Sequence, residues 1–272
     1  MSAARGRRVR WGQNFLVDAN VAGRIVDWAS PDGRDVLEIG PGRGALTESL
    51  LERSATLTLL EIDPALAASW TLRAGSEPRL KVVEGDATEY DFATLSTSPK
   101  LVVSNLPYES GTAILMAMLE CAWSVEEIVV MLQKEVCERV MASAGEPAYG
   151  MLAIHSYMRA NVEAGMKVGP GAFRPQPKVD SRVLRLRPLE GLRHPVGDPA
   201  VFSWLVREAF ARRRKMVRNS LGAAIDQRFG GGHAADLLDR AEIALDSRPE
   251  VVPPRNFARL SELVTGELVS SA

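Results

Sequence analysis

Short apolar segments of strand length alternate with segments of helical spacing across the first half of the chain. The expected strands lie at residues 35–39, 56–62, 80–83, 101–103 and 128–132. Helical spacing marks residues 45–53, 112–123 and 134–142. This alternation is typical of α/β proteins and predicts a mostly parallel, doubly wound sheet with helices packed against it.

The character of the chain changes after Pro188. Before it, three more segments are expected to be strands, at residues 152–158, 160–168 and 182–187. After it, apolar residues recur only at helical spacing, as in 202–210, 237–245 and 257–269. We therefore expect two domains, a sheet-containing domain of residues 1–189 and a small all-helical domain of residues 190–272. A chain of 272 residues is long enough for both.

The segment Ser104–Tyr108 follows the apolar strand 101–103. Pro107 ends that strand because it has no N–H to donate to a sheet. The Asn105 amide, the Leu106 carbonyl and the Tyr108 ring are thus expected at the carboxyl edge of the sheet, where α/β proteins bind ligands. Two acceptors beside a stacking ring suit the exocyclic amino group of a planar base. The alternative is a strand-end turn with a packed tyrosine.

A glycine-rich turn, Gly40–Gly44, joins the first expected strand to a helix, which lets the backbone approach a nucleotide-like ligand. Glu61 follows about 20 residues later, at the end of the second strand, where an acid can accept hydrogen bonds from ribose hydroxyls. Asp86, after the third strand, can accept from an adenine amino group, or it is simply a turn residue. Asp18 and Asp63 are expected to cap helices.

Five cations gather in one segment, Arg212, Arg213, Arg214, Lys215 and Arg218, although the whole chain has a net charge of only −1. Like charges this dense repel one another unless anions lie nearby. The segment therefore predicts contact with RNA or DNA phosphates, with a solvated helix face as the alternative. The arginines of 5–10 and 182–187 are candidates to extend this surface.

The remaining composition excludes several classes of protein. The chain has two cysteines and three histidines, and none shows the spacing of a metal site. We expect free thiols and no metal. No apolar run approaches the roughly 20 residues of a membrane span. We expect a soluble, cytoplasmic protein.

The motifs together resemble those of the KsgA (RsmA) family of small-subunit rRNA adenine N6-dimethyltransferases, nearly from end to end. The resemblance is carried by GQNFL at 12–16, EIGPGRGALT at 38–47, EID at 61–63, GDA at 85–87, NLPY at 105–108, LQKEV at 132–136, FRPQPKVDS at 173–181 and RRKMVRNSL at 213–221. The order and spacing of these motifs are more specific than any one of them.

The resemblance implies a Rossmann-like methyltransferase domain that uses S-adenosyl-L-methionine (SAM). It implies dimethylation of two adjacent adenosines near the 3′ end of 16S rRNA, within a pre-30S particle, and a role in late 30S assembly. A monomer is expected. The SAM-binding set would be Asn14, Leu16, Gly40, Gly42, Glu61, Asp86, Ala87 and Asn105. The target adenine would meet Asn105, Leu106, Pro107, Tyr108 and Phe173, with the rings of Tyr108 and Phe173 clamping its two faces.

The chain departs from the family after NLPY. The family continues with Asn, an aliphatic residue, Ser and then Thr or Ser, whereas this chain reads Glu109-Ser110-Gly111-Thr112. Glu109 adds a negative charge beside the target pocket, and Gly111 is expected to loosen the start of the next helix. Both changes bear on the methylation rate or the choice of substrate.

Three alternative functions compete with this interpretation. An Erm-like methyltransferase of 23S rRNA would share the fold and the core motifs. A non-catalytic ribosome-assembly or transcription factor on the same fold is disfavoured by the presence of Glu61, Asp86 and NLPY. A DNA adenine methyltransferase satisfies the same motif logic less well.

Overall fold

The computed structural model describes residues 14–95, 97–121, 124–229 and 232–270. The chain divides into two compact units. The first contains the described residues up to Cys137 together with Asn161–Pro188, and the second contains Glu138–Ala160 and the described residues from Leu189 onward. The sequence placed residues 138–160 in the first domain, whereas here they group with the second unit.

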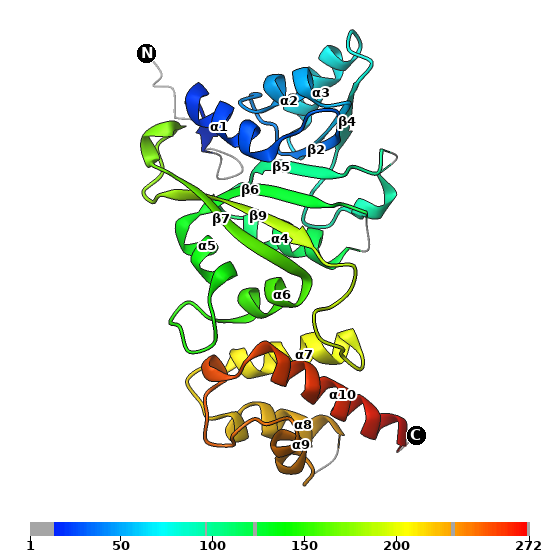
Figure 1. Ribbon diagram of the computed structural model, residues 1–272, viewed down its shortest axis with the longest axis vertical. Helices are drawn as coiled ribbons and strands as arrows, with labels where there is room; N and C mark the ends of the chain where they lie inside the picture. Colours follow the sequence, from blue (N-terminus) through cyan, green and yellow to red (C-terminus); the bar gives the residue numbers. More distant parts are fainter. Residues whose placement is uncertain (1–13, 96, 122–123, 230–231, 271–272) are drawn as a thin grey trace, which may run out of the picture. The chain divides into compact units, whose positions relative to one another are not determined.

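The first unit is built on a seven-stranded sheet in the order β4-β3-β2-β5-β6-β9-β7, which can be followed in Figure 1. Its strands are β2 (Asp35–Ile39), β3 (Thr56–Glu61), β4 (Leu80–Glu84), β5 (Leu101–Asn105), β6 (Glu127–Gln133), β7 (Ala160–Val168) and β9 (Ser181–Pro188). Strands β2 to β6 pair in parallel, and β9 pairs antiparallel with β6. The predicted doubly wound, mostly parallel sheet is confirmed.

Helices cover the sheet because its strands are apolar on both faces: consecutive residues such as Val102 and Val103 have no exposed surface. Buried residues of α1 (Ala19–Ala29) and α2 (Thr47–Arg53) form one cluster with alternate residues of the strands. The unit also contains α3 (Pro64–Ala74), α4 (Gly111–Glu120) and the first half of α5 (Lys134–Met141). Asp18 caps α1 and Asp63 caps α3, as predicted.

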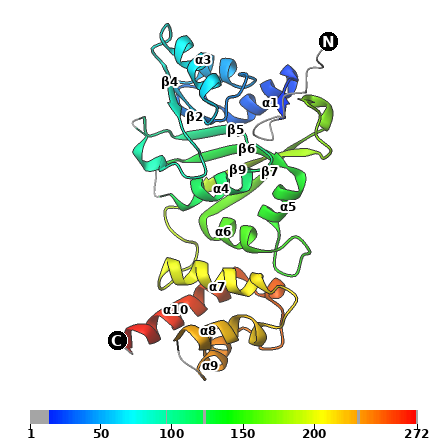
Figure 2. The ribbon, with the colours of Figure 1, turned by 180° about the vertical axis from the view of Figure 1, so that it is seen from behind.

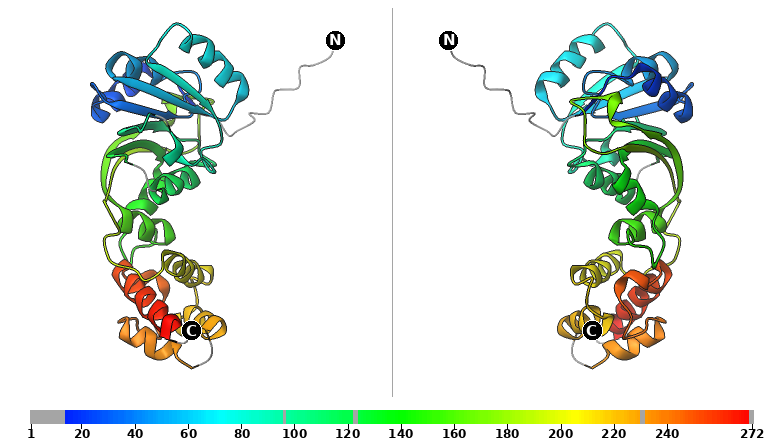
Figure 3. Two further views of the ribbon diagram at one scale, coloured as in Figure 1. Left: turned by 90° about the vertical axis from the view of Figure 1, so that its right-hand side faces the viewer. Right: turned by 90° about the vertical axis from the view of Figure 1, so that its left-hand side faces the viewer.

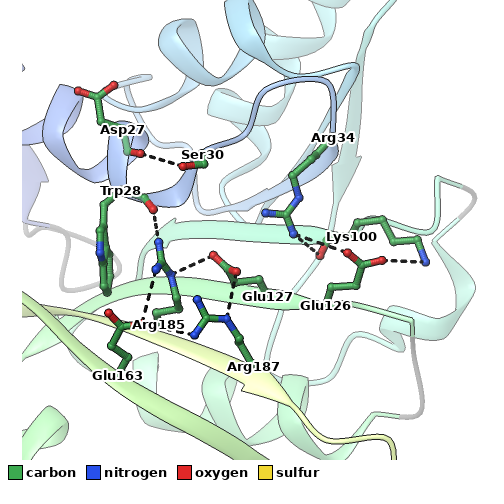
Figure 4. A network of polar contacts seen from close by, with 10 residues as sticks. All are labelled: Asp27, Trp28, Ser30, Arg34, Lys100, Glu126, Glu127, Glu163, Arg185 and Arg187. Carbon is green, nitrogen blue, oxygen red and sulfur yellow. Dashed lines mark hydrogen bonds and ion pairs between the residues drawn. The ribbon is translucent and has the colours of Figure 1, made fainter.

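Arg185 of β9 ties α1 to the antiparallel side of the sheet (Figure 4). Its guanidinium lies 4.3 Å from the ring centre of Trp28 in α1 and donates to the Trp28 carbonyl. It also pairs with Glu127 of β6 at 3.0 Å and with Glu163 of β7 at 3.5 Å. Arg187 pairs with the same two carboxylates, at 3.5 and 3.4 Å. Four secondary-structure elements are thus held together by one charge network.

The segment 152–158, predicted as a strand, belongs instead to helix α6 (Met151–Arg159). The prediction was wrong because α6 is buried on nearly all sides, His155 and Ser156 included, so its sequence lacks a polar stripe. A short apolar run of this kind fits a buried strand and a buried helix equally well. The neighbouring strand β7 lies where it was predicted.

The second unit is helical. Besides α6 it contains α7 (Pro199–Ala211), α8 (Leu221–Phe229), α9 (Ala234–Arg240) and α10 (Pro254–Ser270), seen from behind in Figure 2 and from two sides in Figure 3. Its core includes the fully buried Phe202, Leu205, Leu238 and Phe257. The all-helical character predicted for residues after 190 is confirmed, although α9 ends at Arg240 and not at Leu245.

Candidate active site

A cavity of about 310 Å³ opens at the carboxyl ends of the parallel strands in the first unit. Its wall comes from strand β1 (Phe15–Leu16), the glycine turn, the ends of β2, β3 and β5, and the segment after β5. Of the predicted cofactor set, the structure brings seven residues to this wall: Asn14, Leu16, Gly40, Gly42, Glu61, Asp86 and Asn105. Residues from five separate motifs therefore share one site.

The glycine turn has a left-handed backbone at Gly40 (φ 65°), Gly42 (φ 55°) and Gly44 (φ 87°). A Cβ atom on Gly42 would lie 3.1 Å from Cε1 of Phe15, and one on Gly44 would lie 2.7 Å from the Trp70 ring. A Cβ atom on Gly40 would meet nothing within 4 Å. The first glycine thus leaves open space on the cavity wall, while the other two pack against rings.

Glu61 is buried at the end of β3, with both carboxylate oxygens in use. Oε2 accepts from the N–H of Gly42 at 3.1 Å, and Oε1 accepts from the N–H of Asp63 at 2.9 Å. A carboxylate has about four acceptor positions, so each oxygen keeps one for a ligand. These bonds fix the orientation of Glu61 and couple it to the glycine turn.

Glu38 also lines the cavity, and the sequence analysis missed it. It is 2% exposed and accepts from Oγ1 of Thr47 at 2.7 Å. Burial raises the pKa of Glu38 to about 8, against the opposing effect of the Thr47 hydrogen bond and with a smaller contribution from the charge of Glu61. The sequence signal for Glu38 is its position: it is the second-to-last residue of the strand before the glycine turn.

Asp86 lies on the cavity wall and also forms the predicted turn. Its Oδ1 accepts from the N–H of Thr88 at 2.8 Å and from the Thr88 hydroxyl at 2.7 Å. The two interpretations of Asp86 are therefore compatible, because Oδ2 makes no hydrogen bond with any residue that the structure describes and can contact a ligand. Ala87 differs: it is buried and is not among the residues of the cavity wall, so its place in the cofactor set stays a prediction.

The segment after β5 presents the acceptors that the sequence predicted. Leu106 is held by a hydrogen bond from its N–H to the Met131 carbonyl at 3.1 Å, and the Pro107 carbonyl accepts from Gly111 at 2.7 Å. Oδ1 of Asn105 is buried without a hydrogen-bond partner among the residues that the structure describes. A buried acceptor without a partner costs free energy, about 1–3 kcal/mol, unless a ligand supplies the donor.

Tyr108 is half-buried, and its hydroxyl lies 2.7 Å from Oγ of Ser181. Burial raises the Tyr108 pKa, while the Ser181 hydrogen bond opposes the shift. The Phe173 ring lies 6.3 Å from the Tyr108 ring at 65°, edge to face, and has no exposed surface. The predicted clamp of two facing rings is therefore not formed. Phe173 supports Tyr108 from the core because its backbone is fixed in β8 (Phe173–Arg174).

The start of the described chain is held against the same support. Leu16 of β1 pairs antiparallel with Phe173 of β8, and Phe15 pairs with Arg174. The Arg43 guanidinium lies 4.6 Å from the Phe15 ring centre. Residues 14–16 thus lie between the glycine turn and strand β8. Gly12 and Gln13 of the same motif lie outside the described residues.

Gly111, expected to loosen the start of α4, has a packing reason. It is buried, and a Cβ atom there would lie 2.8 Å from Cδ2 of Leu132 and 3.3 Å from Cβ of Leu106. The small residue lets α4 pack closely against Leu132 of β6 and against Leu106, which follows β5. Glu109 is exposed and lines the cavity.

The basic segment lies in the second unit and follows α7, which ends at Ala211; of its cations, Arg218 lies in a short 3-10 helix, Val217–Asn219. Four of its five cations are exposed: Arg212, Arg214, Lys215 and Arg218. Arg213 instead pairs with Glu250 at 3.0 Å and donates to the Pro147 carbonyl at 2.7 Å. In the candidate extension in β9, Arg185 and Arg187 are paired with carboxylates, and a contact of this strand with RNA stays a prediction. Residues 5–10 lie outside the described part of the chain.

Comparison with known proteins decides the family. The sequence matches the family described as ribosomal RNA adenine dimethylase over residues 5–265. The chain belongs to this family. It is 42% identical to ribosomal RNA small subunit methyltransferase A of Pseudomonas aeruginosa over 257 residues, which is 93% of each chain. The protein of that name from Aromatoleum aromaticum is 43% identical over 228 residues, 84% of this chain and 85% of the relative.

Solved structures of the same kind share the fold. The 23S rRNA methyltransferase ErmE has a TM-score of 0.62 and 28% identity, covering 92% of this chain and 99% of its own. A dimethyladenosine transferase from Plasmodium falciparum has a TM-score of 0.74 and 23% identity, covering 90% and 95%. The predicted Rossmann-like methyltransferase fold is confirmed, as is the assignment to a family of SAM-dependent rRNA methyltransferases.

Two further properties of the described residues concern metal binding and membrane crossing. No group of three or more His, Cys, Asp or Glu side chains is arranged to hold a metal ion there. None of the helices in that part of the chain is long and apolar enough to cross a membrane.

Proposed function

We propose that this protein dimethylates N6 of two adjacent adenosines near the 3′ end of 16S rRNA, within a pre-30S particle, and acts in late assembly of the small subunit. The observation that carries the chemistry is Oδ1 of Asn105 on the cavity wall, which is buried and has no hydrogen-bond partner among the described residues. The choice of the small subunit is supported by the names of the relatives at about 40% identity.

The cavity wall suits the proposed methyl donor. SAM supplies a sulfonium-bound methyl group, which is electrophilic without further activation. Gly40 leaves room for the amino-acid part of the donor, and the free acceptor positions of Glu61 suit ribose hydroxyls. Oδ2 of Asp86 suits the adenine amino group, because Oδ1 is engaged in its own turn. Leu16 and Asn14 would close the site from the other side.

Asn105 and Leu106 would act on the target base by positioning it. The N6 lone pair of adenine is delocalised into the ring, so the nitrogen is a weak nucleophile. Oδ1 of Asn105 and the Leu106 carbonyl would accept the two amino hydrogens and hold N6 with its lone pair toward the methyl group. The Leu106 carbonyl is set in place by the hydrogen bond of its own N–H to Met131. This arrangement requires no general base.

Tyr108 would stack on the target base after the base has left the RNA helix. Its ring is fixed at three points: the hydroxyl contacts Ser181, the edge-on Phe173 packs against it, and Pro107 precedes it in the chain. A ring held in this way loses little entropy when a base binds. Stacking of one base on an aromatic ring contributes about 1–3 kcal/mol.

The four exposed cations of the basic segment, Arg212, Arg214, Lys215 and Arg218, would contact rRNA phosphates. Phosphate contacts position the protein on the RNA and make binding sensitive to salt. We propose that Arg213 shapes this segment and makes no phosphate contact, because its guanidinium is bonded to Glu250 and Pro147.

The test is methylation by purified protein with radiolabelled SAM. The substrates are immature 30S particles from a KsgA-deficient strain, free 16S rRNA and free 23S rRNA. Dimethyladenosine in the 16S rRNA of the particles is the expected product. Modification of 23S rRNA alone would establish the Erm-like function, which the 28% identity to ErmE makes the second candidate. Transfer to none of the three substrates would contradict both.

A further inference from the structure

Glu109 is a carboxylate on the cavity wall that no internal contact explains. It is exposed, it follows Tyr108 directly, and it makes no hydrogen bond or ion pair with any residue that the structure describes. Members of the family that this chain resembles carry a neutral Asn here. An unpaired acid beside a site for RNA, whose phosphates are negative, lowers RNA affinity unless it has another partner.

The rest of the wall is already acidic. Glu61 and Asp86 contribute carboxylates, and Arg43 is the one cation among the described residues of the wall. Its guanidinium is placed over the Phe15 ring. Glu109 therefore raises the negative charge at the end of the cavity nearest Asn105 and Tyr108. A cationic ligand group is favoured at this end, and a neutral one gains nothing from it.

We infer that Glu109 makes the cavity prefer the cationic methyl donor over its neutral product, and so limits product inhibition. This inference rests on the proposed use of SAM. In the transfer, the sulfur–methyl bond breaks and its electron pair stays on sulfur, while the N6 lone pair forms the new bond to carbon and N6 loses a proton to water. The sulfonium thus becomes a neutral thioether, S-adenosylhomocysteine, and only the reactant carries the charge that Glu109 attracts.

The size of the effect follows from the exposure of Glu109. Two unit charges 4 Å apart interact with about 1 kcal/mol in water, and the interaction falls with distance and with salt. A preference of about three- to tenfold is therefore expected from this one side chain at low ionic strength. If Glu109 only repelled RNA, its removal would leave the binding of SAM and of S-adenosylhomocysteine unchanged.

The experiment is calorimetry on the full-length protein without RNA, at low and at 0.5 M salt. Three probes are used: SAM, S-adenosylhomocysteine, and sinefungin, which carries an amine where SAM carries the sulfonium. The variants are Glu109→Gln and Glu109→Asn. The matched control is Glu89→Gln, which removes another exposed carboxylate of the first unit that lies outside the cavity wall.

We expect both Glu109 variants to bind SAM and sinefungin three- to tenfold more weakly than the wild type at low salt. Their affinity for S-adenosylhomocysteine should change less than twofold. At high salt, the variants and the wild type should bind each probe equally. The Glu89 variant should bind all three like the wild type. Equal weakening of the binding of all three probes, or no change in the binding of any of them, would overturn this inference but not the proposed function. Failure of the wild-type protein to bind any probe would overturn the proposed function as well.

Discussion

The hydroxyl of Tyr108 lies 2.7 Å from Oγ of Ser181, which is fully buried at the first position of β9. This contact joins the proposed target-binding loop to a strand 73 residues further along the chain. It fixes the angle of a ring whose purpose, in our account, is to receive a base.

Removing this hydrogen bond should slow methylation without weakening donor binding. Ser181→Ala leaves the ring in place but lets it rotate, and loss of one such bond costs about 1 kcal/mol. We expect about a fivefold to tenfold fall in kcat/KM for the RNA and an unchanged Kd for SAM. Tyr108→Phe should have a similar effect, and the double variant should be no worse than either single one, because both remove the same bond. Additive losses would show that Ser181 acts on something other than Tyr108.

The glycine turn provides a matched pair of substitutions. Gly40→Ala and Gly42→Ala both place a side chain at positive φ, but only the Cβ at Gly42 would meet an atom, Cε1 of Phe15 at 3.1 Å. Gly42→Ala should therefore lower the free energy of unfolding more than Gly40→Ala does, by about 1 kcal/mol. Gly40→Ala should mainly weaken SAM binding, since it fills the open part of the cavity. Urea unfolding and calorimetry separate these effects, and equal destabilisation by both variants would argue against the packing seen at Phe15.

The buried Glu38 makes the stability of the protein depend on pH. Its pKa is raised from 4.5 to about 8 in the folded protein, so between these values the folded state holds a proton that the unfolded state has lost. The free energy of unfolding should fall as pH rises from about 5 to 8, by up to about 1.4 kcal/mol per pH unit from this group. Glu38→Gln should remove this part of the slope. Urea unfolding of both proteins at several pH values is the measurement, and parallel curves for the two would contradict the shift.

Two arginines of the basic segment are expected to have different roles: Arg214 contacts phosphate, and Arg213 stabilises the fold. Arg214→Ala should weaken binding to RNA and lower the slope of log K against log salt by about 0.7–0.9, the value for one lost phosphate contact. Arg213→Ala should instead lower thermal stability, because it breaks the pair with Glu250 and the bond to Pro147, and leave the slope nearly unchanged. If the two variants change the salt slope equally, Arg213 contacts RNA too.

Much of the fold could be predicted because its strands are short apolar runs that end in recognisable signals. Pro107 ends one such strand, and Asp63 caps the helix after another. The helix α6 could not be predicted, because a helix buried on nearly all sides has no polar face to reveal its period. The ion pair of Arg213 could not be predicted for a different reason: its partner, Glu250, is 37 residues away in the sequence.

The loop residues of the candidate site could be predicted better than the buried side chains that pack behind them. Asn14, Gly40, Glu61, Asp86 and Asn105 follow strands or precede a helix, and such positions converge at one edge of a parallel sheet. The burial of Phe173 and the packing of Gly111 against Leu132 depend on side chains from distant elements, which no local pattern records. The orientation of the Phe173 ring, edge-on to Tyr108, is a property of the packed core alone.

The central claim is that the acceptor of Asn105 holds the amino group of a target adenine beside the methyl donor. The most direct test is Asn105→Ala, assayed with immature 30S particles from a KsgA-deficient strain, with dimethyladenosine in 16S rRNA mapped by primer extension. We expect the variant to stay folded, as judged by its circular dichroism, and to retain most of its SAM affinity in calorimetry. Its methylation rate should fall by at least about a hundredfold, which is the scale of loss when one positioned hydrogen-bonding group is removed from an active site. A folded variant that methylates the particles at a rate near that of the wild type would contradict the central claim.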